Sequence, residues 1–230
     1  MSAIKRKLIL IMLSPSSLKF LKELQKNNNK PWFDEHKAQY QEAKADYESL
    51  VQQIIDGLSR QDEDIQGLQV KDCTFRIYKD VRFSKDKSPY KTNMGAAFAK
   101  GGKKSPYAGY YFHFEPGGKS FAAGGLWMPD APILKKTRQE IDYNFAEFQD
   151  IISQKEFIRA FGKVDGDALK TVPQGYSADN PALAYLKLKS LTVSKSFTDE
   201  VCTQPALTRE ILKTFAVMHP FLAFLNRAFD

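Results

Sequence analysis

The spacing of the apolar residues changes along the chain, and this change constrains the fold more than any other feature. Over residues 32–58 apolar side chains recur in steps of three and four, which is the period of an amphipathic helix. Over residues 75–83 and 110–114 they alternate with polar residues, which is the period of a strand with one buried face. Blocks of helix followed by blocks of strand are typical of α+β proteins.

Short turns separate the expected strands. Residues 84–89 and the Pro116-Gly117-Gly118 sequence have the composition of tight turns. Adjacent strands that are joined by short turns pair antiparallel. We therefore predict an α+β fold in which an antiparallel sheet, roughly residues 66–127 plus 187–195, packs against N-terminal and C-terminal helices.

Prolines mark where the helices should begin. Pro15, Pro31 and Pro132 each fit the first turn of an expected helix, where a proline needs no backbone hydrogen bond. A last helix is expected from Pro205. Pro220 should kink or break this helix, because its ring clashes with the preceding turn.

No linker or change in composition divides the chain of 230 residues. We predict a single α+β domain over residues 12–230, and we expect residues 1–11 to be a disordered or non-native extension, with Met12 as a candidate start. The apolar stretch in residues 8–13 is too short for a membrane span, so no membrane contact is expected. The oligomeric state stays open.

The cysteines and histidines predict neither a disulfide framework nor a metal site. Cys73 and Cys202 lie far apart without the spacing of a zinc motif, which indicates a reducing, cytoplasmic compartment. The three histidines are dispersed as well. We expect no metal and no cofactor.

The positive charge is concentrated in one segment. The net charge is +7, and residues 71–104 hold ten Lys and Arg against three Asp, so this segment contains the whole excess. A local excess of this kind attracts anionic partners. A solvated basic loop without a ligand is the alternative.

The centre of this segment, residues 76–91, is the predicted site. In an extended chain, every second side chain projects from one side at steps of about 6 to 7 Å, here those of Arg76, Tyr78, Asp80 and Arg82. The two guanidinium groups can hold a phosphate or carboxylate. The predicted ligand-binding residues are Arg76, Arg82, Asp86, Lys87, Tyr90 and Arg138. In the alternative interpretation, the two aspartates neutralise the cations in a structural network.

Two residues are predicted to transfer protons. Asp80 lies among the cations, and His113 shares the polar face of an expected strand with Glu115, which makes an acid/base pair possible. Both side chains of the strand pair also fit an ordinary sheet surface. Arg138 lies at an apolar position of its helix, so it should extend outward or meet a buried anion.

The basic segment resembles the defining motif of DUF2461, an uncharacterised bacterial family, which reads Arg-x-x-Arg-Asp-x-Arg-Phe-x-x-x-Asp/Asn-Lys-x-x-Tyr. The matching residues are Arg76, Asp80, Arg82 and Phe83, followed by Asp86, Lys87 and Tyr90 after a spacing that is one residue shorter than in the motif. Lys79 replaces the second arginine, which keeps the charge but loses the bidentate geometry. The resemblance covers nearly the whole chain from Met12, and it implies kinship without a mechanism.

Three functions fit these features. We favour a protein that binds, or also acts on, a small phosphorylated or carboxylated molecule. The first alternative is a nucleic-acid-binding module whose tyrosines stack on bases, with Tyr78, Tyr90, Tyr107 and Tyr110 as candidates. The second is a structural or protein-interaction role for the ion pairs. Whether the protein is an enzyme stays open.

Overall fold

The computed structural model describes residues 12–229, so the expected extension of residues 1–11 lies outside the described part. It has the predicted α+β class. The helices are α1 (Pro15–Lys26), α2 (Lys30–Glu35), α3 (Lys37–Leu58), α4 (Val70–Cys73), α5 (Ala131–Tyr143), α6 (Phe145–Ser153), α7 (Lys155–Phe161), α8 (Leu183–Leu186), α9 (Asp199–Cys202) and α10 (Leu207–Asn226), with short 3-10 turns η1 (Glu63–Ile65) and η2 (Arg227–Phe229). The strands are β1 (Met94–Phe98), β2 (Gly109–Phe114), β3 (Ser120–Leu126) and β4 (Leu191–Phe197).

The four strands form one antiparallel sheet in the order β1-β2-β3-β4. The antiparallel prediction is therefore confirmed. Its predicted limits were too wide, because the sheet begins at Met94 rather than near residue 66. The last strand ends at Phe197, two residues beyond the expected position.

The strand that we expected over residues 75–83 does not form. The segment stays extended, but only isolated bridges join Thr74 to Ala96 and Tyr78 to Tyr90. Of the four apolar residues that alternate there, only Ile77 is buried. Alternation produces a strand only where a partner covers the apolar face, and most of this segment has no such cover.

Proline and capping residues begin the helices as expected. Ser14, Asn29 and Asp130 each cap a helix N-terminus through the side chain. The helix expected from Pro31 is interrupted at His36, where the backbone leaves the helical region (φ −101°, ψ 19°) and the ring stacks on Trp32.

Of the kink or break expected at Pro220, the break does not occur. Helix α10 continues through this residue to Asn226. Phe215, Met218 and Phe221 are fully buried on both sides of the proline. This packing compensates for the missing backbone hydrogen bond.

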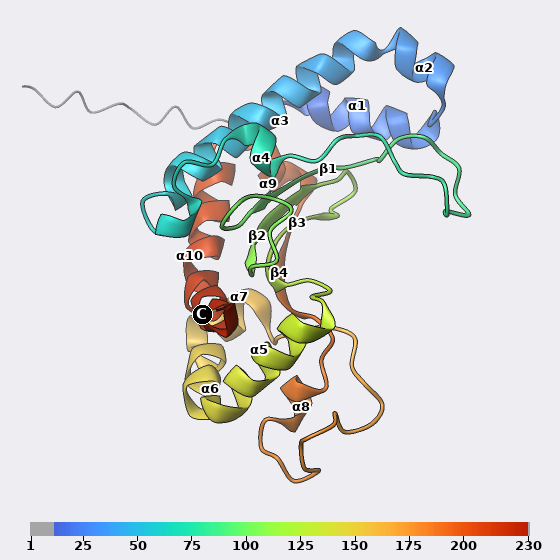
Figure 1. Cartoon of the computed structure of the whole chain (residues 1–230). Coiled ribbons are helices and arrows are strands. Elements are labelled where there is room, and N and C mark those ends of the chain that lie inside the picture. The colour runs from blue at the N-terminus through green and yellow to red at the C-terminus, as the bar shows by residue number, and fades with distance from the viewer. Residues whose placement is uncertain (1–11, 230) are drawn as a thin grey trace, which may run out of the picture.

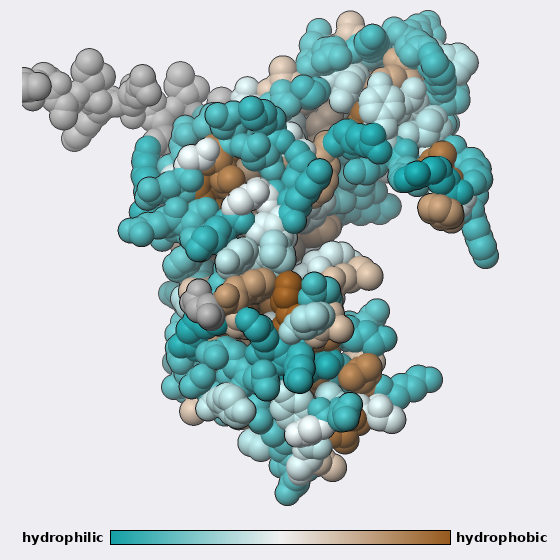
Figure 2. Space-filling model, in the orientation of Figure 1, coloured by the Kyte–Doolittle hydropathy of each residue, from teal (hydrophilic) through white to brown (hydrophobic). Residues whose placement is uncertain are grey.

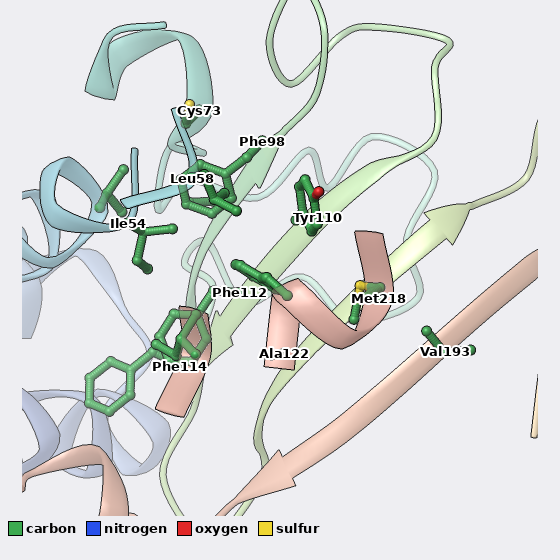
Figure 3. Packing of buried hydrophobic residues seen from close by; sticks show 14 of the residues in the cluster. Ile54, Leu58, Cys73, Phe98, Tyr110, Phe112, Phe114, Ala122, Val193 and Met218 are labelled. Atoms are coloured by element: carbon green, nitrogen blue, oxygen red, sulfur yellow. The ribbon is translucent and has the colours of Figure 1, made fainter. Parts of the chain in front are cut away.

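Helices α3 and α10 cover one face of the sheet (Figure 1). Tyr47 of α3 donates a hydrogen bond from its hydroxyl to the carbonyl of Phe112 (3.0 Å). Phe215 of α10 packs on Tyr110, with 4.9 Å between the ring centroids. Figure 3 shows Tyr110 and Phe112 projecting from β2 into this hydrophobic cluster, which contains residues from Leu13 to Leu225. The even-numbered side chains of β2 and β3 thus belong to the core.

The odd-numbered side chains of β2 and β3 point to the opposite face and are only half-buried. This face lines the groove described below. Within residues 12–229, no helix combines the length and the hydrophobicity needed to cross a bilayer.

Candidate functional site

A groove of about 800 Å³ lies over the sheet face that α3 and α10 leave uncovered. All four strands contribute to its floor, and the segments before β1 and after β3 form its walls. A volume of this size is within the range of small-molecule sites, about 300 to 1,000 Å³. We therefore treat the groove as the candidate site.

The floor of the groove consists mostly of small residues in register across the sheet. One row places Ala97 of β1, Tyr111 of β2 and Ala123 of β3 side by side. Strand pairing gives the next row Gly95, His113 and Phe121 as its members. The two polar side chains of β2 thus stand beside small neighbours on β1, which leaves space above the floor.

Three side chains of β2 and the residue after it form a hydrogen-bonded series. The Nε2 atom of His113 lies 2.9 Å from Oε2 of Glu115, and its Nδ1 atom lies 3.1 Å from the Tyr111 hydroxyl. A carboxylate only accepts, so His113 donates from Nε2 and its Nδ1 accepts from Tyr111. Burial and the nearby Glu115 raise the pKa of Tyr111, which keeps the phenol protonated as a donor.

Aromatic rings and one glycine fix this series in place. Phe121 stacks on the His113 ring at 4.6 Å between centroids, and Phe75 meets Tyr111 edge-on at 6.3 Å. The Tyr111 hydroxyl lies over Gly95, where an added Cβ would stand only 2.4 Å from the oxygen. Gly95 is therefore the residue that admits the hydroxyl.

One cation from the centre of the basic segment reaches the groove. Lys91 lines the groove, and its Nζ atom lies 5.6 Å from the centre of the Phe75 ring. Burial and the positive charge of Arg76 lower the pKa of Lys91. Within the described residues, neither side chain forms a hydrogen bond or ion pair with an acidic residue.

Four other charged residues of the segment form two ion pairs with one another. Residues 76–91 form a projecting loop that we call the basic arm. At its tip, Arg82 binds Asp80 through two hydrogen bonds of 2.9 and 2.7 Å. Lys79 binds Asp86 (2.8 Å), while Lys87 donates to the carbonyl of Val81 (3.0 Å).

These pairs fix the charge states of the two aspartates. The hydrogen bond from Arg82 lowers the pKa of Asp80, and the bond from Lys79 lowers that of Asp86. Both carboxylates are therefore held ionised. Asp80, which we predicted as a proton-transfer residue, lies in the arm and is not among the residues that line the groove.

Tyr90 anchors the arm to the helical part of the molecule. Its ring is buried and stacks on Phe33 at 3.9 Å. The Asn28 side chain accepts from the Tyr90 amide (3.1 Å) and donates to its carbonyl (2.9 Å). These contacts explain how the motif tyrosine is used in this structure.

Arg138 lies apart from the other predicted ligand-binding residues. It extends from α5 and donates from a terminal nitrogen to the carbonyl of Leu188 (3.1 Å). Its Nε atom is buried without a hydrogen-bond partner. Arg138 is not among the residues that line the groove.

The structure thus combines parts of the predicted site with residues that the prediction omitted. His113 lines the groove, whereas Arg76, Arg82, Asp86 and Lys87 lie in the arm and are not among the lining residues. Lys91 belongs to the predicted segment but was not named as a ligand-binding residue, and Tyr111 was not predicted as a site residue. The alternation that places Tyr111 on the face of His113 was the available signal. No cluster of metal-binding side chains occurs in the part of the chain that the structure describes.

Comparison with known proteins places the chain by its family alone. No curated protein and no solved structure shows significant similarity to it. The family model described as "Conserved hypothetical protein (DUF2461)" matches residues 16–224, which include all four strands, the basic arm and most of α10. The chain therefore belongs to the DUF2461 family.

Proposed function

We propose that the groove binds a small organic molecule carrying a phosphate or carboxylate group. The observation that carries the proposal is Lys91, a cation that lines the groove, feels the positive charge of Arg76 and, within the described residues, forms no hydrogen bond or ion pair with an acid. The aspartates of the arm are already bound to other cations. An anionic group on a ligand would compensate the charge of Lys91 and form charge-assisted hydrogen bonds.

The rest of the groove suits the body of such a ligand. Glycine and alanine make the floor flat, and the aromatic rings of Phe75 and Phe121 provide apolar walls. Few polar groups interrupt this surface, which is the usual composition of a small-molecule site. The shape favours a ligand with a flat or apolar part next to its anionic group.

The series of Tyr111, His113 and Glu115 gives this ligand a proton relay. The single hydroxyl proton of Tyr111 is donated to Nδ1 of His113, so the Tyr111 oxygen can accept a proton from the ligand while its own proton passes to His113, and the reverse transfer returns it. Glu115 accepts from Nε2 of His113 and orients the imidazole. In the proposed function, His113 is the proton-transfer residue, and Asp80 has no part in the reaction.

Thermal unfolding in the presence of candidate anions tests the proposal. Nucleotides, sugar phosphates and organic acids should be screened at millimolar concentration. A ligand at about 100 times its dissociation constant stabilises the fold by about 2.7 kcal/mol, which raises the Tm of a chain this long by roughly 5 to 10 °C. Lys91→Ala should abolish the shift.

Lys85→Ala is the matched control, because it removes the same charge from the exposed part of the arm. The control should keep the full shift. Because binding requires a protonated Lys91, affinity should fall at alkaline pH, beginning below the usual lysine pKa of 10.5. Absence of a shift with every anion, or equal shifts for both variants, would contradict the proposal.

A further inference from the structure

The tip of the basic arm exposes an aromatic ring that the rest of residues 12–229 leaves almost uncovered. Phe83 is 96% exposed, and Tyr78 nearer the base of the arm is 50% exposed. A fully exposed phenylalanine costs solubility and gains no packing energy. Its position therefore indicates a partner that covers the ring.

Positive charge surrounds this ring. Residues 76–91 contain six Lys and Arg but only two Asp. Both aspartates are already bound, Asp80 to Arg82 and Asp86 to Lys79. Lys85 and Lys87 follow Phe83 closely in sequence, and both are exposed. The partner should thus carry negative charge next to a surface that stacks on a ring.

The arm is accessible because only its base is tied to the protein. Backbone hydrogen bonds from Lys79 to Pro89 and from Lys91 to Ile77 join the two limbs of the arm, and Asn28 ties the Tyr90 backbone to the rest of the protein. Figure 1 shows the segment between β1 and α4 extending away from the sheet, and Figure 2 shows the same projection as largely hydrophilic with a small hydrophobic area. A flexible chain can therefore approach the tip from several sides.

We propose that the tip of the basic arm binds single-stranded nucleic acid, with Phe83 stacking on a base and Lys85 and Lys87 contacting phosphates. Stacking needs one accessible ring, and every base offers a face for it. A membrane surface fits less well, because a single phenylalanine buries too little apolar area for stable anchoring. The proposal is independent of the groove, which uses Lys91.

Fluorescence anisotropy with labelled single-stranded DNA and RNA of about 20 nucleotides tests this proposal. The wild-type protein should bind both, and the affinity should fall steeply between about 50 and 200 mM salt. Phe83→Ala should weaken binding by roughly 5- to 150-fold, which is the usual effect of losing one stacked base. It should leave the salt dependence unchanged, because the ring carries no charge.

The double variant Lys85→Ala/Lys87→Ala should act on the salt dependence instead. For a single strand, each lost phosphate contact reduces the slope of log K against log salt by about 0.7, so this variant should lower it by about 1.4. Two controls remove an exposed aromatic and an exposed lysine from α5, namely Tyr143→Ala and Lys136→Ala. Both controls should bind like the wild type.

Three results would overturn the proposal. They are the absence of binding at about 50 mM salt, binding that Phe83→Ala leaves unchanged, and equal losses in the α5 controls. Sedimentation with vesicles of anionic phospholipid distinguishes the competing partner, and binding to vesicles without binding to either oligonucleotide would reassign the tip to membranes. None of these measurements depends on the ligand of the groove, so each of the two proposals can be contradicted without the other.

Discussion

Gly95 determines where the Tyr111 hydroxyl can lie. A methyl group at this position would meet the hydroxyl oxygen at 2.4 Å, a distance at which one of the two must move. The oxygen is the outer end of its side chain, so the ring can turn away without moving the backbone. The contact between Tyr111 and His113 is therefore the first contact that a larger residue at position 95 would break.

We expect Gly95→Ala to separate the function of the groove from the stability of the fold. The free energy of unfolding of the variant should lie within about 1 kcal/mol of the wild-type value, because only the end of a side chain has to move. It should lose the stabilisation by the anion found in the screen. Thermal unfolding with and without that anion measures both effects.

Gly125 provides the control for this experiment. Its φ is +130°, and an added Cβ would lie 2.0 Å from the backbone carbonyl of Leu191. Backbone cannot give way as a side chain does, and the strain alone costs about 1 to 3 kcal/mol. Gly125→Ala should thus lower the Tm strongly, and equal stability losses in both variants would contradict our account of Gly95.

At the scale of single residues, the sequence predicted part of the site. Alternation placed His113 and Glu115 on one face, and their hydrogen bond agrees with the predicted pair. The importance of Gly95 could not be predicted, because it depends on the register between β1 and β2. The position of Lys91 at the groove could not be predicted either, because it follows from the path of the arm.

Among the elements, the basic arm depends most on a few contacts at its base. Asn28 closes two hydrogen bonds with the backbone of Tyr90. Each such bond contributes about 0.5 to 1.5 kcal/mol, and together they hold the arm against the α1–α2 connection. The tip is joined by an exposed ion pair and by hydrogen bonds to the carbonyl of Val81, and exposed ion pairs contribute little.

We expect Asn28→Ala to loosen the whole arm. Loss of both hydrogen bonds, about 1 to 3 kcal/mol in total, should speed amide exchange at Tyr90 roughly tenfold or more. Trypsin should also cleave faster after Lys85 and Lys87. Hydrogen exchange and timed proteolysis measure these two effects.

Arg82→Ala removes the ion pair at the tip and serves as the comparison. It should leave the free energy of unfolding and the exchange at Tyr90 unchanged, because Arg82 is largely exposed. A large loss of stability in this variant would instead favour the structural network that we considered as an alternative. The two variants together locate the contacts that hold the arm.

The starts of helices α1, α2 and α5 and the four strands of the sheet were better predicted from the sequence than the arm was. Capping residues and prolines act locally, so their effect is visible in the sequence. The arm was predicted wrongly because its alternating residues are typical of a strand. Its actual position depends on Asn28, which binds the Tyr90 backbone from a distant part of the chain. A long-range contact of this kind has no local signature.

At the scale of the whole molecule, one polar cluster links three distant segments. The Tyr110 hydroxyl of β2 donates to Asp62 (2.9 Å), in the turn after α3, and lies 2.8 Å from Nδ1 of His219 on α10. The hydrogen bond to Asp62 raises the pKa of His219. Burial acts to raise the pKa of Asp62, but the bonds from His219 and Tyr110 outweigh it and lower the pKa.

These shifts predict how stability varies with pH. His219 stabilises the fold fully below its usual pKa of 6.5, and this contribution is lost as the pH rises through its higher folded-state pKa. Asp62 stabilises the fold above its usual pKa of 3.8, and this contribution is lost as the pH falls through its lower folded-state pKa. Both contributions are complete between pH 3.8 and 6.5.

Urea unfolding from about pH 3 to pH 8 measures how the free energy of unfolding varies with pH and so tests the cluster. His219→Gln should remove the decline in stability between about pH 6 and 8. His36→Gln should leave that decline unchanged, because the Nδ1 atom of His36 faces a backbone carbonyl rather than an acid. The same decline in wild type and His219→Gln would show that other groups cause it.

The α+β class and the antiparallel sheet were predictable because hydrophobic period is a repeated, local signal. The position of the groove was not, since it depends on which face of the sheet the helices cover. Helices α3 and α10 are far apart in sequence, and their packing on a shared face is a tertiary property.

The alternation of β2 and β3 assigns neighbouring residues to two independent tasks. Even positions fill the interior, and odd positions meet whatever enters the groove. A substitution at an odd position can therefore alter selectivity while the interior keeps its packing. If the groove binds a ligand as proposed, relatives with this fold can differ in their ligand while their buried residues stay the same.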